Sequence, residues 1–197
     1  MMNIHINLDV INAVDITPLH KYVESCQANQ HFFLLPAGQE HYKILAYFAK
    51  IMDGPLIDIG TYFGFSAAAL SIDESKKVIT YDIYDWISDT DYTIKNRENI
   101  ELRCMDCLDD IPTLLDASFI CLDVSPHDGL QEEEIFKALQ KYKYKGLLFL
   151  DDIHQSKEMD DWWNTITLPK YDLSKYGHFS GSGIVVFDPS KYNIILE

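Results

Sequence analysis

Short apolar runs alternate with segments of helical pattern through the middle of the chain, and most of the runs end at a glycine or an acidic residue. The runs lie at residues 55–60, 77–82, 100–103, 118–123 and 146–151. A strand that is apolar at almost every position is buried on both faces, so these runs predict a parallel sheet covered by helices. The helical segments lie at residues 64–72, 109–115, 131–142 and 155–164. The alternation therefore predicts an α/β fold with a doubly wound sheet, which binds ligands beyond the carboxyl ends of its strands.

The N-terminal part of the chain lacks this alternation. Residues 17–52 hold helical segments, such as 41–49, before the first predicted strand. We expect residues 1–53 to form a helical segment that acts as a lid or a dimer surface, and residues 54–197 to form the α/β core. At 197 residues, the chain is expected to be a single domain.

The C-terminal part also departs from the alternation. After residue 164 the pattern becomes β-like over residues 171–179 and again over 183–187. Gly181 and Gly183 flank Ser182 between these two stretches. Glycines in such a place predict a hairpin or a bulge that joins two strands.

Acidic residues outnumber basic ones by 31 to 16, which gives a formal net charge of −15. Such a surface repels phosphate backbones and anionic lipids, so the charge disfavours nucleic-acid and membrane partners. The chain has neither a leader-like N-terminus nor a run of 18 apolar residues, and no membrane span is expected. Cys104 and Cys107 form a Cys-x-x-Cys without a second pair at zinc-ligand spacing, which favours reduced thiols and a cytoplasmic location.

The first predicted strand runs into a glycine-rich turn at residues 58–64, with the sequence Asp-Ile-Gly-Thr-Tyr-Phe-Gly. Gly60 lets the backbone turn and a ligand approach closely, and Gly64 lets the next helix begin close to the strand. Free amides at that helix start, together with the Ser66 hydroxyl, can hold a carboxylate. S-adenosylmethionine (SAM) presents a carboxylate and an ammonium, and Asp58 is placed to bind the ammonium directly or through water.

The second predicted strand ends at Asp82, 22 residues after Gly60. An acid in this place commonly accepts hydrogen bonds from both hydroxyls of a ribose. The Gly-x-x-x-Gly spacing, with Tyr62 at its centre, departs from the compact Gly-x-Gly-x-x-Gly of dinucleotide sites and disfavours NAD and FAD. These residues alone leave open an unrelated nucleotide, or no ligand, on the same fold.

The segment from Gly60 to Ser66 resembles the first motif of class I SAM-dependent methyltransferases, in the form carried by the catechol and caffeoyl-CoA O-methyltransferase-like families. The resemblance extends over about residues 56–187. It implies a Rossmann-like methyltransferase fold with a mostly parallel, seven-stranded sheet whose last strand is antiparallel. Asp82 matches the ribose-binding acid, and Asp106 falls in the segment near the adenine. The residues expected to bind SAM are Asp58, Gly60, Thr61, Tyr62, Gly64, Ser66, Asp82, Asp106 and Asp123.

The resemblance also places Asp123 at the end of the fourth strand, and Asp151 and Asp152 at the end of the fifth. In metal-dependent members such carboxylates hold Mg²⁺, which lowers the pKa of an acceptor hydroxyl and orients it toward the methyl group. Pro126 stands where catechol-type enzymes carry a lysine base. The run Asp-Asp-Ile-His that ends at His154 looks like a different branch, which need not use a metal and in which His154 would be the general base.

The sequence therefore predicts a SAM-dependent methyltransferase that transfers a methyl group to a hydroxyl of a small molecule. Its candidate catalytic residues are Asp123, Asp151 and His154, and its candidate Mg²⁺ ligands are Asp123, Asp151 and Asp152. Asp151 or Asp152 could equally cap the following helix, and His127 could be an ordinary loop residue. A non-catalytic SAM- or nucleotide-binding regulator on the same fold is the alternative function. Analogy with the family indicates a homodimer.

Overall fold

The computed structural model describes residues 1–26, 29–88 and 92–197. Its strands are β1 (Met2–Ile6), β2 (Leu56–Ile59), β3 (Val78–Asp82), β4 (Ile100–Cys104), β5 (Phe119–Leu122), β6 (Leu147–Asp151), β7 (Lys170–Asp172), β8 (Ser182–Val186) and β9 (Tyr192–Leu196). Its α-helices are α1 (Leu8–Asn12), α2 (Tyr42–Ile51), α3 (Phe65–Leu70), α4 (Ile111–Asp116), α5 (Leu130–Lys141) and α6 (Lys157–Thr165). Short 3₁₀ helices are η1 (Thr17–Tyr22), η2 (Gln30–Phe32), η3 (Thr93–Asn96) and η4 (Cys107–Asp110).

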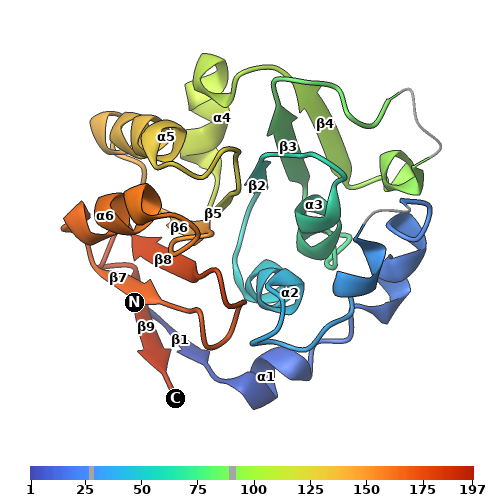
Figure 1. Cartoon of the computed structure of the whole chain (residues 1–197), viewed down its shortest axis with the longest axis horizontal. Coiled ribbons are helices and arrows are strands. Elements are labelled where there is room, and N and C mark those ends of the chain that lie inside the picture. The colour runs from blue at the N-terminus through green and yellow to red at the C-terminus, as the bar shows by residue number, and fades with distance from the viewer. Residues whose placement is uncertain (27–28, 89–91) are drawn as a thin grey trace.

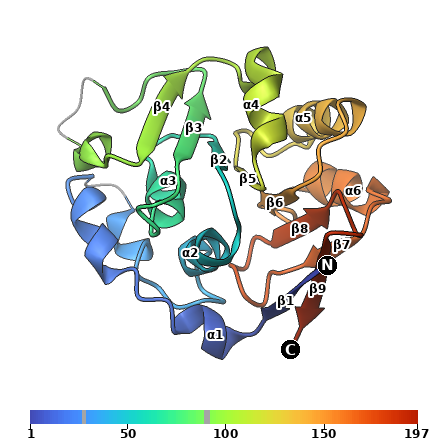
Figure 2. The ribbon, with the colours of Figure 1, turned by 180° about the vertical axis from the view of Figure 1, so that it is seen from behind.

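The main sheet of the described chain has seven strands in the order β4-β3-β2-β5-β6-β8-β7 (Figures 1 and 2). The strands from β4 to β6 are parallel neighbours, whereas β8 runs antiparallel to both β6 and β7. The chain therefore enters this sheet in its middle, at β2, and later strands add outward in both directions. The doubly wound α/β class, the seven strands and the antiparallel final strand are all confirmed.

Two layers of helices cover the sheet because successive residues of each strand face opposite sides. On β2, Leu56 packs with α2 and α3, while Ile57 and Ile59 pack with α4, α5 and α6. All four residues of β2, like all four of β5 and all five of β6, are buried. This double burial is what the continuous apolar runs of the sequence predicted.

The N-terminal segment begins with a strand, which differs from the helical segment expected for residues 1–53. β1 pairs in parallel with β9, with Ile4 opposite Ile194, so the two ends of the chain lie side by side (Figures 1 and 2). Residues 2–6 alternate between outward and buried positions, as the residues of a strand do. The partner strand, β9, lies 190 residues further along the chain. The role of this segment as a lid or a dimer surface stays a prediction.

The β-like stretch predicted at residues 171–179 forms a strand over Lys170–Asp172 alone. The chain then turns, because the backbone N–H groups of Tyr176 and Gly177 both donate to the carbonyl of Leu173. β8 follows after Gly181 and pairs with β7, so the predicted antiparallel connection is present. No helix in the described ranges combines the length and the apolar character needed to cross a bilayer.

Candidate active site

The carboxyl ends of β2, β3, β5 and β6 meet at one edge of the sheet, because these strands are parallel neighbours. The turn after β2 begins at Gly60, β3 ends at Asp82, Asp123 follows β5, and β6 ends at Asp151. The topology therefore gathers the polar residues that the sequence places at strand ends. This edge is where doubly wound sheets bind their ligands.

The turn after β2 is held tightly between its two neighbouring strands. The backbone N–H groups of Gly60 and Thr61 both donate to the carbonyl of Tyr81, over 2.9 and 3.1 Å. Gly60 has a φ of 102°, and a Cβ at this position would lie 1.6 Å from the carbonyl oxygen of Asp123. Tyr62 also has a positive φ, of 40°. Only glycine fits at position 60, and the turn presents the backbone of residues 61–63 to the edge of the sheet.

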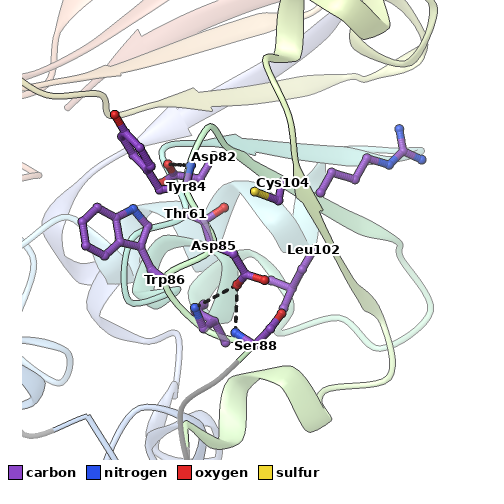
Figure 3. Close-up of a pocket in the computed structure, with 10 residues that line it drawn as sticks. Thr61, Asp82, Tyr84, Asp85, Trp86, Ser88, Leu102 and Cys104 are labelled. Carbon is purple, nitrogen blue, oxygen red and sulfur yellow. Dashed lines mark hydrogen bonds between the residues drawn. The ribbon is translucent and has the colours of Figure 1, made fainter.

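Two pockets open along this edge, and both are lined by Thr61. The first pocket is lined in part by Asp82, Tyr84 and Trp86 on one side and by Leu102 and Cys104 on the other (Figure 3). The second pocket is lined by Asn29, Tyr42, Gly60, Thr61, Tyr62, Phe63, Phe65, Ser66 and Asp123. Because Thr61 lines both pockets, they adjoin at the turn, with Asp82 in the first and Asp123 in the second; we refer to the two pockets together as the groove.

Asp82 lies in the first pocket with its carboxylate fixed by backbone donors. Tyr62 N donates to Oδ2 over 3.1 Å. Tyr84 N donates to Oδ1 over 3.0 Å (Figure 3). Each carboxylate oxygen has about two acceptor positions, so both oxygens can accept a further hydrogen bond from a ligand. Tyr84 is 63% exposed and Trp86 is 44% exposed, and they leave apolar ring surface beside the carboxylate.

Asp58 and Asp106, which were also predicted to bind the cofactor, do not line either pocket. Asp58 is fully buried below the turn, where Thr80 Oγ1 donates to its carboxylate over 2.7 Å. Burial raises the pKa of Asp58 to about 7, and the hydrogen bond from Thr80 opposes this shift. Asp106 caps η4 by accepting a hydrogen bond from Leu108 N. Direct binding of a ligand ammonium by Asp58 is therefore not supported by its position.

Asp123 is the predicted catalytic acid that lines the groove. Partial burial and the negative charge of Asp151 raise the pKa of Asp123 to about 7, although the charges of His41 and His127 oppose this shift. His127, which the sequence left as a loop residue, has a φ of 58°. Its Nε2 lies 3.9 Å from Asp123 Oδ1 and 3.5 Å from Asp152 Oδ2. The second pocket thus contains a carboxyl group whose pKa is raised toward neutrality.

The predicted Mg²⁺ ligands Asp123, Asp151 and Asp152 are not gathered into one set of three. Within residues 1–26, 29–88 and 92–197, four groups of three residues bring their donor atoms within 4.8 Å of one another, and each group contains a histidine. Asp123 and Asp151 converge with His41, Asp123 and Asp152 with His127, and Asp151 and Asp152 with His178. The strand-end acids are therefore neighbours of imidazoles, which the sequence did not indicate.

Asp151 is buried between two histidines from distant parts of the chain. His178 Nε2 lies 2.6 Å from Asp151 Oδ1, and His41 Nδ1 lies 3.4 Å from the same oxygen. Burial favours the protonated form of Asp151, but the charges of His41 and His178 outweigh it and lower its pKa. Burial likewise opposes the charge on His41, but Asp151 and Glu40 outweigh it and raise the pKa of His41 to about 10. The end of β6 thus carries a compact, buried cluster of charges.

His154, predicted as a general base, lies outside this cluster. Its Nδ1 lies 2.8 Å from Asp160 Oδ1 of α6, and its Nε2 lies 3.0 Å from Asp172 Oδ2 of β7. Both ring nitrogens therefore contact carboxylates, and His154 links α6 to β7. The prediction of a catalytic His154 is not supported by this geometry, and a structural role explains the residue.

The sequence missed His41 and His178 because neither lies at the end of a parallel strand. His41 stands just before α2, and His178 lies in the connection between β7 and β8. The one available signal was the pair of glycines at positions 181 and 183, which predicted a hairpin or a bulge close to His178. Only the three-dimensional path of the chain brings these two rings to Asp151.

No protein-family model matches the chain, and no curated protein matches it in sequence. Solved structures match it in fold. A methyltransferase from Geobacter sulfurreducens has a TM-score of 0.61 at 14% identity, covering 88% of this chain and 91% of its own. The Podospora anserina methyltransferase PaMTH1, bound to S-adenosylhomocysteine (SAH), has a TM-score of 0.59 at 11% identity, covering 87% and 86%.

A third structure is the O-methyltransferase TomG from Streptomyces achromogenes in complex with SAM, which has a TM-score of 0.54. It is 16% identical and covers 93% of this chain and 99% of its own. At these identities the likeness establishes the fold. The chain has the Rossmann-like methyltransferase fold that the resemblance implied.

Proposed function

We propose that this protein is a SAM-dependent methyltransferase that transfers a methyl group to a hydroxyl of a small molecule. The observation that carries the proposal is the pair of pockets at the carboxyl edge of the sheet, which share Thr61 and contain Asp82 and Asp123 respectively. A groove in this place, with a glycine turn at its centre, suits an extended ligand that has a nucleoside at one end and an amino acid at the other. The SAM and SAH bound to structures of the same fold support this ligand.

The nucleoside end of SAM would lie in the first pocket. Both oxygens of Asp82 are held by backbone N–H groups and keep acceptor positions for the two ribose hydroxyls. The exposed rings of Tyr84 and Trp86 offer apolar surface for the adenine. The methionine end would then lie against the turn at residues 60–64, with Ser66 in the same pocket. SAM supplies an electrophilic methyl group, so the protein has to position the acceptor and remove a proton.

We assign the removal of that proton to Asp123. It lines the second pocket beside the glycine turn, at the end of the groove opposite Asp82. A hydroxyl bound there would lie within reach of the Asp123 carboxylate, which can accept its proton during transfer. His127, which lies near Asp123 and Asp152, would stabilise the negatively charged form of Asp123 before the reaction.

A Mg²⁺ site made of Asp123, Asp151 and Asp152 does not fit this arrangement. Mg²⁺ demands oxygen ligands in near-octahedral geometry. The three acids do not converge as a set, and Asp151 is already engaged by His178 and His41. We therefore derive no step of the reaction through Mg²⁺.

Methyl transfer can be tested by measuring SAH release from SAM in the presence of a panel of small phenols, sugars and hydroxy acids. The Asp123→Asn variant is expected to bind SAM with unchanged affinity and to lose at least about 100-fold in kcat, because general-base catalysis contributes about 100- to 10,000-fold. The non-catalytic alternative predicts that SAM binds but that no acceptor in the panel leads to SAH formation. Equal kcat in the native protein and in Asp123→Asn would remove Asp123 from the mechanism.

A further inference from the structure

Tyr42, the first residue of α2, lines the second pocket together with Asp123. Its ring is partly buried and packs between two phenylalanine rings, with centroid distances of 5.2 Å to Phe33 and 5.9 Å to Phe65. Its hydroxyl forms no hydrogen bond with any residue that the structure describes. A polar group that is withdrawn from water without a partner costs free energy, so the Tyr42 hydroxyl calls for an explanation.

Tyr47, five residues further along the same helix, shows how a tyrosine of α2 serves the fold. Its hydroxyl donates a hydrogen bond to the carbonyl of His5 over 2.6 Å, which ties α2 to β1. Tyr47 lines neither of the two pockets. The fold therefore uses the hydroxyl of Tyr47, whereas the hydroxyl of Tyr42 is left for a molecule that enters the second pocket.

The Tyr42 hydroxyl is available as a hydrogen-bond donor. Burial raises the pKa of Tyr42 well above its ordinary value, and the negative charges of Glu40, Asp123 and Asp151 add to this effect. The hydroxyl therefore keeps its proton throughout the physiological range. Asp123, when ionised, can only accept hydrogen bonds. The second pocket thus offers a bound molecule a donor from Tyr42 and an acceptor from Asp123.

A hydroxyl group matches this donor and this acceptor, and an amino group does not. A hydroxyl oxygen carries one proton and two lone pairs. When its proton is directed to Asp123 and one lone pair accepts a hydrogen bond from Tyr42, the second lone pair stays free to attack a methyl group. A neutral amine nitrogen has a single lone pair, which cannot accept a hydrogen bond and attack at the same time. The arrangement therefore favours oxygen over nitrogen as the attacking atom.

We propose that Tyr42 selects a hydroxyl as the methyl acceptor, by donating a hydrogen bond to the acceptor oxygen while Asp123 accepts its proton. The inference rests on the proposed methyl transfer and adds the residue that discriminates between acceptor atoms. In the reaction, the free lone pair of the oxygen forms the new O–C bond, and the C–S bond of SAM breaks with its electron pair going to sulfur, which gives SAH. The hydroxyl proton passes to the Asp123 carboxylate, and Tyr42 keeps its own proton.

The test compares Tyr42→Phe with Tyr47→Phe, which each remove one hydroxyl from α2 and keep the ring. The acceptors are phenol and aniline, or the hydroxyl compound of the panel that reacts fastest and its amino analogue. In Tyr42→Phe, kcat/KM for the hydroxyl compound should fall about 10-fold, as the loss of one hydrogen bond does, and kcat/KM for the amine should not fall. The ratio of the two should therefore shrink about 10-fold in Tyr42→Phe and keep its native value in Tyr47→Phe.

Two further measurements need no turnover. Calorimetric titration of the same hydroxyl compound into SAH-saturated protein should show about 10-fold weaker binding in Tyr42→Phe than in native protein or Tyr47→Phe. The midpoint of urea unfolding should keep its native value in Tyr42→Phe, because the fold does not use that hydroxyl. It should fall in Tyr47→Phe, which loses the hydrogen bond to His5. This contrast separates a ligand-binding hydroxyl from a structural one.

A native ratio of the two kcat/KM values in Tyr42→Phe, with native binding of the hydroxyl compound, would overturn the role of Tyr42 and leave methyl transfer intact. Weaker SAM binding by Tyr42→Phe with an unchanged ratio would also overturn it, because the hydroxyl would then bind the cofactor. Native protein that binds SAM but forms no SAH with any acceptor would contradict the proposed function itself, and the role of Tyr42 in acceptor choice would fall with it.

Discussion

Nε2 of His178 donates a hydrogen bond to Oδ1 of Asp151 over 2.6 Å, although the two residues stand 27 positions apart in the chain. The contact ties the connection before β8 to the end of β6. His41 approaches the same oxygen from the segment before α2. Asp151, which the sequence offered as a catalytic group or a helix cap, is thus the centre of a buried charge cluster that joins three segments.

Removing the carboxylate of Asp151 should therefore destabilise the fold. In Asp151→Ala, His41 and His178 lose their common counter-charge in a buried place, and breaking a buried pair costs about 3–5 kcal/mol. The free energy of unfolding, measured by urea titration, should fall by this amount. Asp161→Ala removes the ion-pair partner of Lys157 on the exposed face of α6. This control should change the free energy of unfolding by less than about 0.5 kcal/mol. A loss of unfolding free energy below about 1 kcal/mol in Asp151→Ala would show that the two buried histidines do not depend on the Asp151 carboxylate.

Two glycines with similar backbone angles should respond differently to alanine. Gly60 has a φ of 102° and Gly54 a φ of 84°, but a Cβ at Gly60 would meet Asp123, whereas a Cβ at Gly54 would meet nothing within 4 Å. Gly54→Ala should cost about 1–2 kcal/mol for the left-handed backbone alone. Gly60→Ala should cost more than about 3 kcal/mol, because it adds a clash to the strain. Equal unfolding free energies for the two variants would refute the close packing of the turn against β5.

His154 should stabilise the fold in a way that depends on pH. Burial lowers its pKa, but the hydrogen bonds to Asp172 and Asp160 outweigh burial and raise it above 6.5. A group with a raised folded pKa contributes its full stability below the unfolded value of about 6.5 and loses it as the pH rises through the folded value. His154→Gln should therefore cost about 1 kcal/mol at pH 6, a value reduced by the partial exposure of the ring.

The difference between the native protein and His154→Gln should then shrink as the pH is raised above neutrality. Urea titrations of both proteins at a series of pH values give this difference directly. The SAM affinity of His154→Gln should equal that of the native protein, because the ring faces α6 and β7. A loss of methyl transfer in this variant, without a loss of stability, would restore the catalytic role that the geometry argues against.

The sequence was sufficient to predict the sheet and the acids at its edge. Strands that are buried on both faces have continuous apolar sequences, and the end of each apolar run marks the end of its strand. The sequence alone therefore placed Asp82, Asp123 and Asp151 at the carboxyl edge of the sheet. The pairing of β1 with β9 could not be predicted, because it joins residues 190 positions apart through short strands. Local patterns carry the period of a strand but not the identity of its partner.

The histidines show the same limit at the site. His154 stands beside the strand-end acids in sequence, yet Asp160 and Asp172 turn its ring toward α6 and β7. His41 precedes the first strand of the main sheet, and only the packing of α2 against that sheet brings it to Asp151. Proximity along the chain was therefore a poor guide to which imidazole meets the acidic cluster.

In the proposed binding mode, SAM lies along the groove with its ribose at Asp82. Calorimetric titration of SAM into native protein and into Asp82→Asn tests this mode most directly. Asp188→Asn is the matched control, because Asp188 also accepts a hydrogen bond from the backbone N–H two residues later but lies outside both pockets. We predict micromolar binding by the native protein and by Asp188→Asn, and binding at least about 10-fold weaker in Asp82→Asn, since hydrogen bonds to a charged group contribute about 1.5–3 kcal/mol. Native protein that binds neither SAM nor SAH, or Asp82→Asn that binds SAM as tightly as native protein, would contradict the account.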